Sequence, residues 1–194
     1  MDEFLFYSKL GFNHVLDIKA YDHVLFFAAL VVPYLFKDWK RVILLVTIFT
    51  VGHTLTLLLA VYGQLSFSGT YIEFLIPITI FITALYNVFT AGKSVSGKGL
   101  NLVFFTSLFF GLIHGLGFSR YFKQIVAQQD TKFIKTLEFA LGVEAAQVIV
   151  AFLILLLGVL MQTVFRFNRR DWILVLSSII IGMVIPMLIN TYPF

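Results

Sequence analysis

Long apolar stretches make up most of this chain, and they leave few folds open to it. Of its 194 residues, 60% are hydrophobic and only 12% are charged, and the mean hydropathy is +0.96. Soluble domains carry about twice that share of charged residues, roughly 25%. A helix needs about 20 apolar residues to cross a bilayer. The chain therefore predicts one integral membrane domain, an all-α polytopic bundle of about six transmembrane helices.

Short polar segments divide the sequence into the expected helices. The first apolar run, Val24–Phe36, is too short to cross a membrane, so we extend its helix back toward Phe12. The mixed segment 120–135 is expected to be an interfacial amphipathic segment or a short lid. The acidic start, MDEFLFYSKLGF, differs from the basic start of a signal peptide and predicts a mature N-terminus. The expected helices are approximately 12–36, 42–62, 72–90, 100–118, 133–165 and 172–190.

The basic residues lie between the apolar stretches, where membrane interfaces are expected. No basic run alternates with aromatic residues, so the net charge of +4 does not indicate nucleic-acid binding. Six helices put both termini on one side, and Lys and Arg in short loops mark the cytoplasmic side. We expect a multi-pass protein of a bacterial inner membrane with both termini in the periplasm and membrane lipids around it; a homo-oligomer stays open. The loops expected inside carry Lys37, Lys40, Arg41, Lys93, Lys98, Arg166, Arg169 and Arg170, against Lys9, Lys19, Arg120, Lys123, Lys132 and Lys135 outside.

All four histidines lie within or beside apolar stretches. An ionisable side chain is costly inside a membrane, which makes each of them a functional hypothesis, and neutral imidazole is a common metal ligand. The expected helices run alternately up and down, and this places the polar candidates between the midplane and the amino-terminal side. We therefore predict one convergent metal site. Its candidate ligands are His14, Asp22, His23, His53, His114 and Glu144.

Each candidate also has a purely structural interpretation. An interfacial ring is the alternative for His14, and hydrogen bonding across helices is the alternative for His53 and His114. Glu144 would be protonated in a helix contact, and Asp22 would orient a histidine without binding metal. The chain has no cysteine, so any metal is held by nitrogen and oxygen. This disfavours Cu(I) and leaves Zn, Ni, Co, Mn or Fe(II), of which we expect Ni, Zn or Co.

Five segments, in order along nearly the whole chain, resemble the HupE/UreJ family. This family comprises small bacterial membrane proteins associated with hydrogenase and urease maturation. The resemblance implies a core of six helices and a permease-like handling of nickel. The segments are GFNHVLDIKAYDHVLFFAAL (Gly11–Leu30), FTVGHTLTL (Phe49–Leu57), IEFLIPITI (Ile72–Ile80), FGLIHGLGFS (Phe110–Ser119) and LGVEAAQ (Leu141–Gln147).

The resemblance also implies which residues bind the metal. His14, Asp22 and His23 correspond to a His-x5-Asp-His motif of the family, although seven residues separate His14 from Asp22 here. His114 corresponds to the histidine of a Phe-His-Gly motif, with Ile113 in place of the phenylalanine. His53 and Glu144 fall in a Gly-His-Ser/Thr and a Glu-x-x-Gln element of the family, respectively.

Three functions fit these residues. The first is non-enzymatic uptake or delivery of a divalent ion, with nickel expected. Asn87, Ser94 and Ser96 are the only sequence hints of a path for this ion to the second side of the membrane. The second is a metal hydrolase in which histidine-bound zinc activates water and Glu144 or Asp22 is the general base. The third is haem binding by paired histidines. A continuous row of polar side chains past Asn87 would favour transport. A histidine site closed below by Phe and Leu side chains would favour catalysis or sensing.

Overall fold

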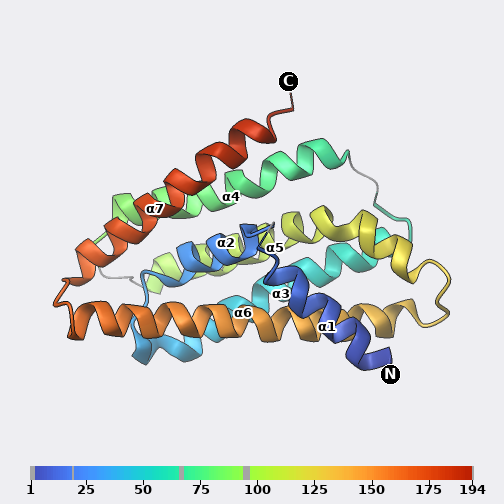
Figure 1. Ribbon diagram of the computed structural model, residues 1–194, viewed down its shortest axis with the longest axis horizontal. Helices are drawn as coiled ribbons and strands as arrows, with labels where there is room; N and C mark the ends of the chain where they lie inside the picture. Colours follow the sequence, from blue (N-terminus) through green and yellow to red (C-terminus); the bar gives the residue numbers. More distant parts are fainter. Residues whose placement is uncertain (1–2, 19, 66–67, 94–96, 194) are drawn as a thin grey trace.

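The computed structural model describes residues 3–18, 20–65, 68–93 and 97–193, and the side chains of the last range from residue 102 onward. The described residues form helices and no strand, and most of them lie in seven α-helices (Figure 1). A single 3₁₀ turn, η1 (Phe36–Asp38), precedes α3. The α-helices are α1 (Glu3–Val15), α2 (Asp22–Val31), α3 (Trp39–Val61), α4 (Gly69–Thr90), α5 (Gly97–Val126), α6 (Lys132–Thr163) and α7 (Arg169–Asn190).

Five segments are long and apolar enough to cross a membrane. Between 28% and 56% of their apolar windows is buried inside the protein, so the remaining apolar surface faces outward, as lipid-facing helices require. The prediction of an all-helical, membrane-type bundle is confirmed. The described residues contain five long apolar spans, however, and not the six that were predicted. The five are Phe36–Val61, Gly69–Thr90, Leu102–Val126, Lys132–Thr163 and Arg169–Asn190.

The predicted first helix, 12–36, is wrong as a single helix. The segment instead holds the end of α1, non-helical residues 16–18 and 20–21, the short helix α2 and the start of η1. Figure 1 shows α1 and α2 following one another in the same general direction, with the interruption near the middle of the molecule. At the interruption, Asp22 Oδ1 accepts the His23 backbone N–H at 2.7 Å. Aspartate competes with helical hydrogen bonding in this way, which favours a helix start at this position.

The predicted end of the fourth helix at 118 is also wrong. Helix α5 continues to Val126 and α6 begins at Lys132, so most of the interfacial segment or lid expected over 120–135 belongs to these two helices, with a short turn between them. The sequence Arg120–Val126 contains no glycine or proline that would end a helix. The helices expected at 42–62, 72–90, 133–165 and 172–190 agree with α3, α4, α6 and α7 to within three residues at each end.

Glycines allow the closest helix contacts in the bundle. A Cβ built on Gly142 of α6 would overlap the backbone carbonyl of Ser8 in α1, and one built on Gly115 of α5 would overlap the His53 carbonyl in α3. Small residues of this kind let membrane helices approach until their backbones touch. The pairs α1–α6 and α3–α5 therefore hold α1 and α3 in fixed positions, and these two helices carry His14 and His53.

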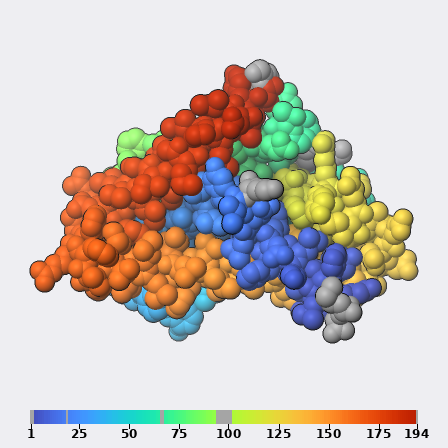
Figure 2. All heavy atoms as spheres, in the orientation of Figure 1, coloured from blue at the N-terminus to red at the C-terminus, as the bar shows by residue number. Residues whose placement is uncertain are grey.

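Helix α2 lies in the interior of the bundle. Every residue from Leu25 to Val31 is buried, so this helix is apolar on all sides. Phe26 and Phe27 are fully buried and pack on Phe49 of α3, with ring centroids 4.8 Å and 5.0 Å apart. Figure 2 shows α2 between α7 and α6 on the visible face of the molecule. The short helix is thus held by packing, and with it the position of His23.

Candidate metal site

Three histidines from three different helices converge at the interruption between α1 and α2. His14 lies in the last turn of α1, His23 in the first turn of α2 and His53 in the middle of α3. One ligand atom from each lies within 4.8 Å of the other two. The ring centroids are 4.7 Å apart for His14–His23, 5.8 Å for His23–His53 and 6.0 Å for His14–His53. His14 and Asp22 lie on either side of the interruption between α1 and α2, which separates them by seven residues in the sequence.

Four of the six imidazole nitrogens of this cluster are buried without hydrogen-bond partners. His23 and His53 are 1% and 0% exposed. Nε2 of His14, Nε2 of His23 and both ring nitrogens of His53 contact no donor or acceptor among the residues that the structure describes. Buried polar atoms without partners are rare in proteins and call for a ligand, a water molecule or an ion. Four such atoms in one place indicate a site for a bound group.

Asp22 orients His23. Its Oδ1 lies 2.9 Å from His23 Nδ1, and the same oxygen accepts the His23 backbone N–H. A carboxylate accepts hydrogen bonds, so Nδ1 carries the ring proton and Nε2 keeps its lone pair. This is the arrangement that fixes metal-binding histidines in many proteins. Of the two roles considered for Asp22, the geometry corresponds to orientation of a neighbouring histidine.

His114 lies beside the cluster but outside the group of three. Its ring centroid is 5.2 Å from that of His23, and the residue is 1% exposed. Its Nε2 lies 3.0 Å from Thr79 Oγ1 of α4, while Nδ1 has no partner in the described part of the chain. The position of His114 on α5 follows from the close α3–α5 contact at the next residue, Gly115.

Glu144 is not brought into the histidine group. It lies on α6, and its Oε1 accepts a hydrogen bond of 2.6 Å from Thr47 of α3. Thr47 precedes His53 by six residues, which is about 9 Å along a helix axis. One turn further along α6, Gln147 accepts a 2.8 Å hydrogen bond from Thr50. These two pairs form a separate polar contact between α3 and α6.

Phenylalanine rings enclose the histidines. Phe26 and Phe49 lie 5.2 Å and 5.2 Å from the His114 ring centroid, and Phe118 lies 4.0 Å from the His14 ring centroid. Phe139 stacks at 6.4 Å on His53. These phenylalanine rings come from α2, α3, α5 and α6 and pack around the imidazoles from four helices.

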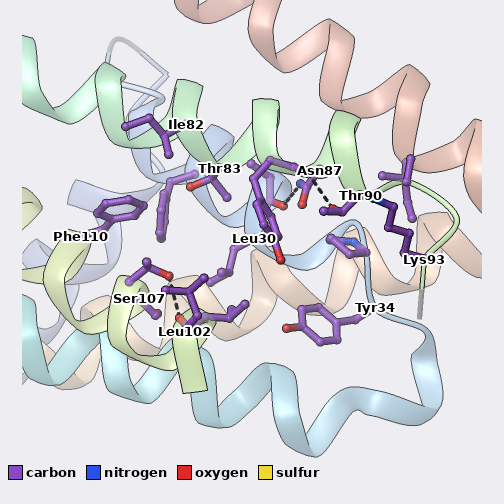
Figure 3. Close-up of a pocket in the computed structure, with 18 of the residues that line it drawn as sticks. Leu30, Tyr34, Ile82, Thr83, Asn87, Thr90, Lys93, Leu102, Ser107 and Phe110 are labelled. Carbon is purple, nitrogen blue, oxygen red and sulfur yellow. Dashed lines mark hydrogen bonds between the residues drawn. The ribbon is translucent and has the colours of Figure 1, made fainter. Parts of the chain in front are cut away.

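A cavity of about 340 Å³ lies beyond this aromatic layer, and Phe26 lines it. Figure 3 shows Asn87, Thr83 and Ser107 around it, with Asn87 Nδ2 donating a 2.6 Å hydrogen bond to the Ala29 carbonyl. Asn87 thus contacts α2, while Thr83, which lines the same cavity, donates a 2.7 Å hydrogen bond to the backbone carbonyl of Thr79, the residue beside His114. The other two sequence hints of a path, Ser94 and Ser96, and also Lys19, lie outside the described residues.

Sequence reasoning did not single out Thr79 or Phe26. Thr79 is 2% exposed and contacts His114, and Phe26 stands between His114 and the cavity. A threonine or a phenylalanine in an apolar helix is ordinary, so no signal in a single sequence marks either one. Their importance follows only from the packing of α2 and α4 against α5.

The fold and the site define a class of protein: a membrane-type helical bundle with a buried imidazole cluster. A family model described as HupE / UreJ protein matches residues 1–191. The chain therefore belongs to the HupE/UreJ family, as the sequence motifs predicted. Comparison with curated proteins gave no match, and comparison with solved structures gave none either.

Proposed function

We propose that this protein binds a divalent transition metal ion as cargo through His14, His23 and His53, and that it takes up or delivers this ion. Nickel is the favoured ion, and zinc or cobalt would suit the same donors. Membership of the HupE/UreJ family supports a membrane accessory protein for metals rather than an enzyme. The observation that carries the proposal is the group of buried ring nitrogens without partners.

The charge of the site suits an ion that is bound and released. Three neutral imidazoles supply strong donors but no negative charge. The carboxylate of Asp22 lies 2.9 Å from His23 and supplies one negative charge beside the cluster. A divalent ion would therefore keep a net positive charge in a buried place, which is costly. Such a site holds an ion less tightly than one with several carboxylates or thiolates, as transport or delivery requires.

The interrupted helix adds to this argument. Transporters of other kinds place their ion sites where a membrane helix is interrupted near the midplane. Here His14 lies in the last turn of α1, and the carbonyl end of a helix favours a cation. We propose that α1 and α2 together make a sixth, interrupted crossing. This gives an inner-membrane protein with both termini in the periplasm and the three basic loops in the cytoplasm.

The hydrolase alternative has less support. A general base must reach the attacking water, directly or through one other water. Asp22 Oδ1 is engaged by both N–H groups of His23, and Glu144 is bonded to Thr47 outside the cluster. The aromatic side chains around the imidazoles suit a transporter that is closed on one side, with Phe26 as the barrier between His114 and the cavity.

Metal uptake into proteoliposomes tests the proposal. Vesicles would hold purified protein and a nickel-sensitive dye, and Ni²⁺ would be added outside. We expect saturable uptake that is lost in the His23→Ala/His53→Ala variant and kept in Thr163→Val, a change at an exposed position on α6. Binding of Ni²⁺ without uptake would favour delivery. Equal uptake by wild type and the double histidine variant would contradict the proposal.

A further inference from the structure

Thr79 and His114 form a buried hydrogen-bonded pair between α4 and α5. Thr79 Oγ1 lies 3.0 Å from His114 Nε2, and the two residues are 2% and 1% exposed. The same threonine oxygen lies 2.7 Å from the backbone carbonyl of Ile76. Two neighbours therefore share one hydroxyl group, and a hydroxyl has one proton to donate.

The proton of Thr79 determines which nitrogen of His114 is protonated. A carbonyl oxygen can only accept, so the Ile76 contact takes the hydroxyl proton. The threonine oxygen then faces His114 with lone pairs, and Nε2 must be the N–H donor. Neutral imidazole carries one proton, which leaves Nδ1 with a free lone pair. His114 Nδ1 is the nitrogen that has no partner among the described residues.

The opposite arrangement is less favourable. If Thr79 donated to Nε2, the 2.7 Å contact with the Ile76 carbonyl would lose its proton. His114 Nδ1 would then carry a hydrogen in a buried place with no acceptor. Buried N–H groups without acceptors are rarer than buried acceptors without donors, and leaving one costs about 1–3 kcal/mol.

His114 adjoins the site through His23; it lies outside the group of three ligand atoms, so it would join the same ion only with a movement of its ring. The ring centroids of His23 and His114 are 5.2 Å apart, which is within the 4.7–6.0 Å range of the three clustered rings. His23 is prepared by the same means, because Asp22 accepts from Nδ1 and leaves Nε2 free. Both histidines thus have one nitrogen bonded to a fixed acceptor and one nitrogen without a partner.

We propose that Thr79 is a positioning residue that holds His114 as the Nε2–H tautomer, so that Nδ1 serves as a fourth metal ligand. This inference rests on the proposed function and deepens it. The imidazoles of His14, His23 and His53 and Nδ1 of His114 would then give the ion four ligands, all of them nitrogen atoms. Such a set suits Ni²⁺, Zn²⁺ or Co²⁺ and excludes the hard ions Mg²⁺ and Ca²⁺, which prefer oxygen.

The experiment uses nitrogen NMR of the full chain in detergent, with ¹⁵N in its four histidines. Long-range proton–nitrogen spectra distinguish the two tautomers of each ring, first without metal and then with Zn²⁺, which is diamagnetic. Each histidine is assigned with its own alanine variant. Thr79→Val removes the hydroxyl at nearly constant volume, and Thr79→Ser keeps it as the matched control.

For the metal-free wild type we expect His114 as the Nε2–H tautomer, and we expect Zn²⁺ to shift its Nδ1 signal. Thr79→Val should mix the tautomers and weaken Ni²⁺ binding 10- to 100-fold, the usual effect of losing such a partner, while Thr79→Ser restores both. An Nδ1–H tautomer in the wild type overturns the inference. So does a Zn²⁺ complex that leaves the His114 signals unchanged, and in that case the three-histidine site survives. Failure of the wild type to bind either ion overturns the proposed function itself.

Discussion

The contact between α1 and α6 gives a quantitative prediction for metal binding. A Cβ added at Gly142 would lie 2.7 Å from the carbonyl carbon of Ser8 and 2.9 Å from the backbone nitrogen of Phe12. Ordinary van der Waals contact begins at 3.4 Å, so α1 must move by about 0.7 Å or more. Metal–ligand distances tolerate errors of only about 0.2 Å. Gly142→Ala should therefore displace His14 from a shared ion and weaken Ni²⁺ binding at least about tenfold, or about 1.4 kcal/mol.

Calorimetric titration of the purified protein with Ni²⁺ measures this effect. Gly182→Ala is the matched control, because a Cβ there meets nothing within 4 Å on α7. This control should bind as the wild type does and gain about 1 kcal/mol of helix stability from alanine. Overpacking at Gly142 should instead cost about 1–3 kcal/mol. In a His14→Ala background, Gly142→Ala should have no further effect on binding, since the two changes remove the same ligand. Wild-type affinity in folded Gly142→Ala would refute this reasoning.

Three further variants test other parts of the site. Asp22→Asn should weaken Ni²⁺ binding 10- to 100-fold in the same titration, because the amide no longer fixes the His23 tautomer; unchanged affinity would show that Asp22 does not orient the ring. Phe26→Ala removes the barrier between His114 and the 340 Å³ cavity, and it should raise the rate of Ni²⁺ flux through vesicles; Phe26→Leu, which keeps most of the volume, should not. Glu144→Gln should leave affinity within about twofold, since Thr47 and not the cluster binds this carboxylate; a tenfold loss would place Glu144 among the ligands.

The sequence predicts the helices well where apolar length alone decides them. Helices α3, α4, α6 and α7 are bounded by turn-forming or charged residues, and their limits could be read to within three residues. The interruption between α1 and α2 could not, because no proline or glycine marks residues 16–21. It depends on the backbone contact of Asp22 and on the burial of α2 among its neighbours.

The candidate site was predictable in composition but not in geometry. Four histidines in apolar segments pointed to a metal, and three of them lie together with His114 beside them. The separation of Glu144 from this group follows from its contact with Thr47, which crosses from α6 to α3. Partners in another helix leave no pattern within a single sequence, and the same holds for Thr79.

The central claim is that the buried imidazole cluster binds one divalent ion. The most direct measurement is the metal content and Ni²⁺ affinity of detergent-purified protein, for the wild type and for His23→Ala/His53→Ala. We predict one Ni²⁺ per chain with saturable binding in the wild type, and loss of that binding in a variant whose helical content is unchanged. Equal binding by the two proteins, or no binding by the wild type, would contradict the account.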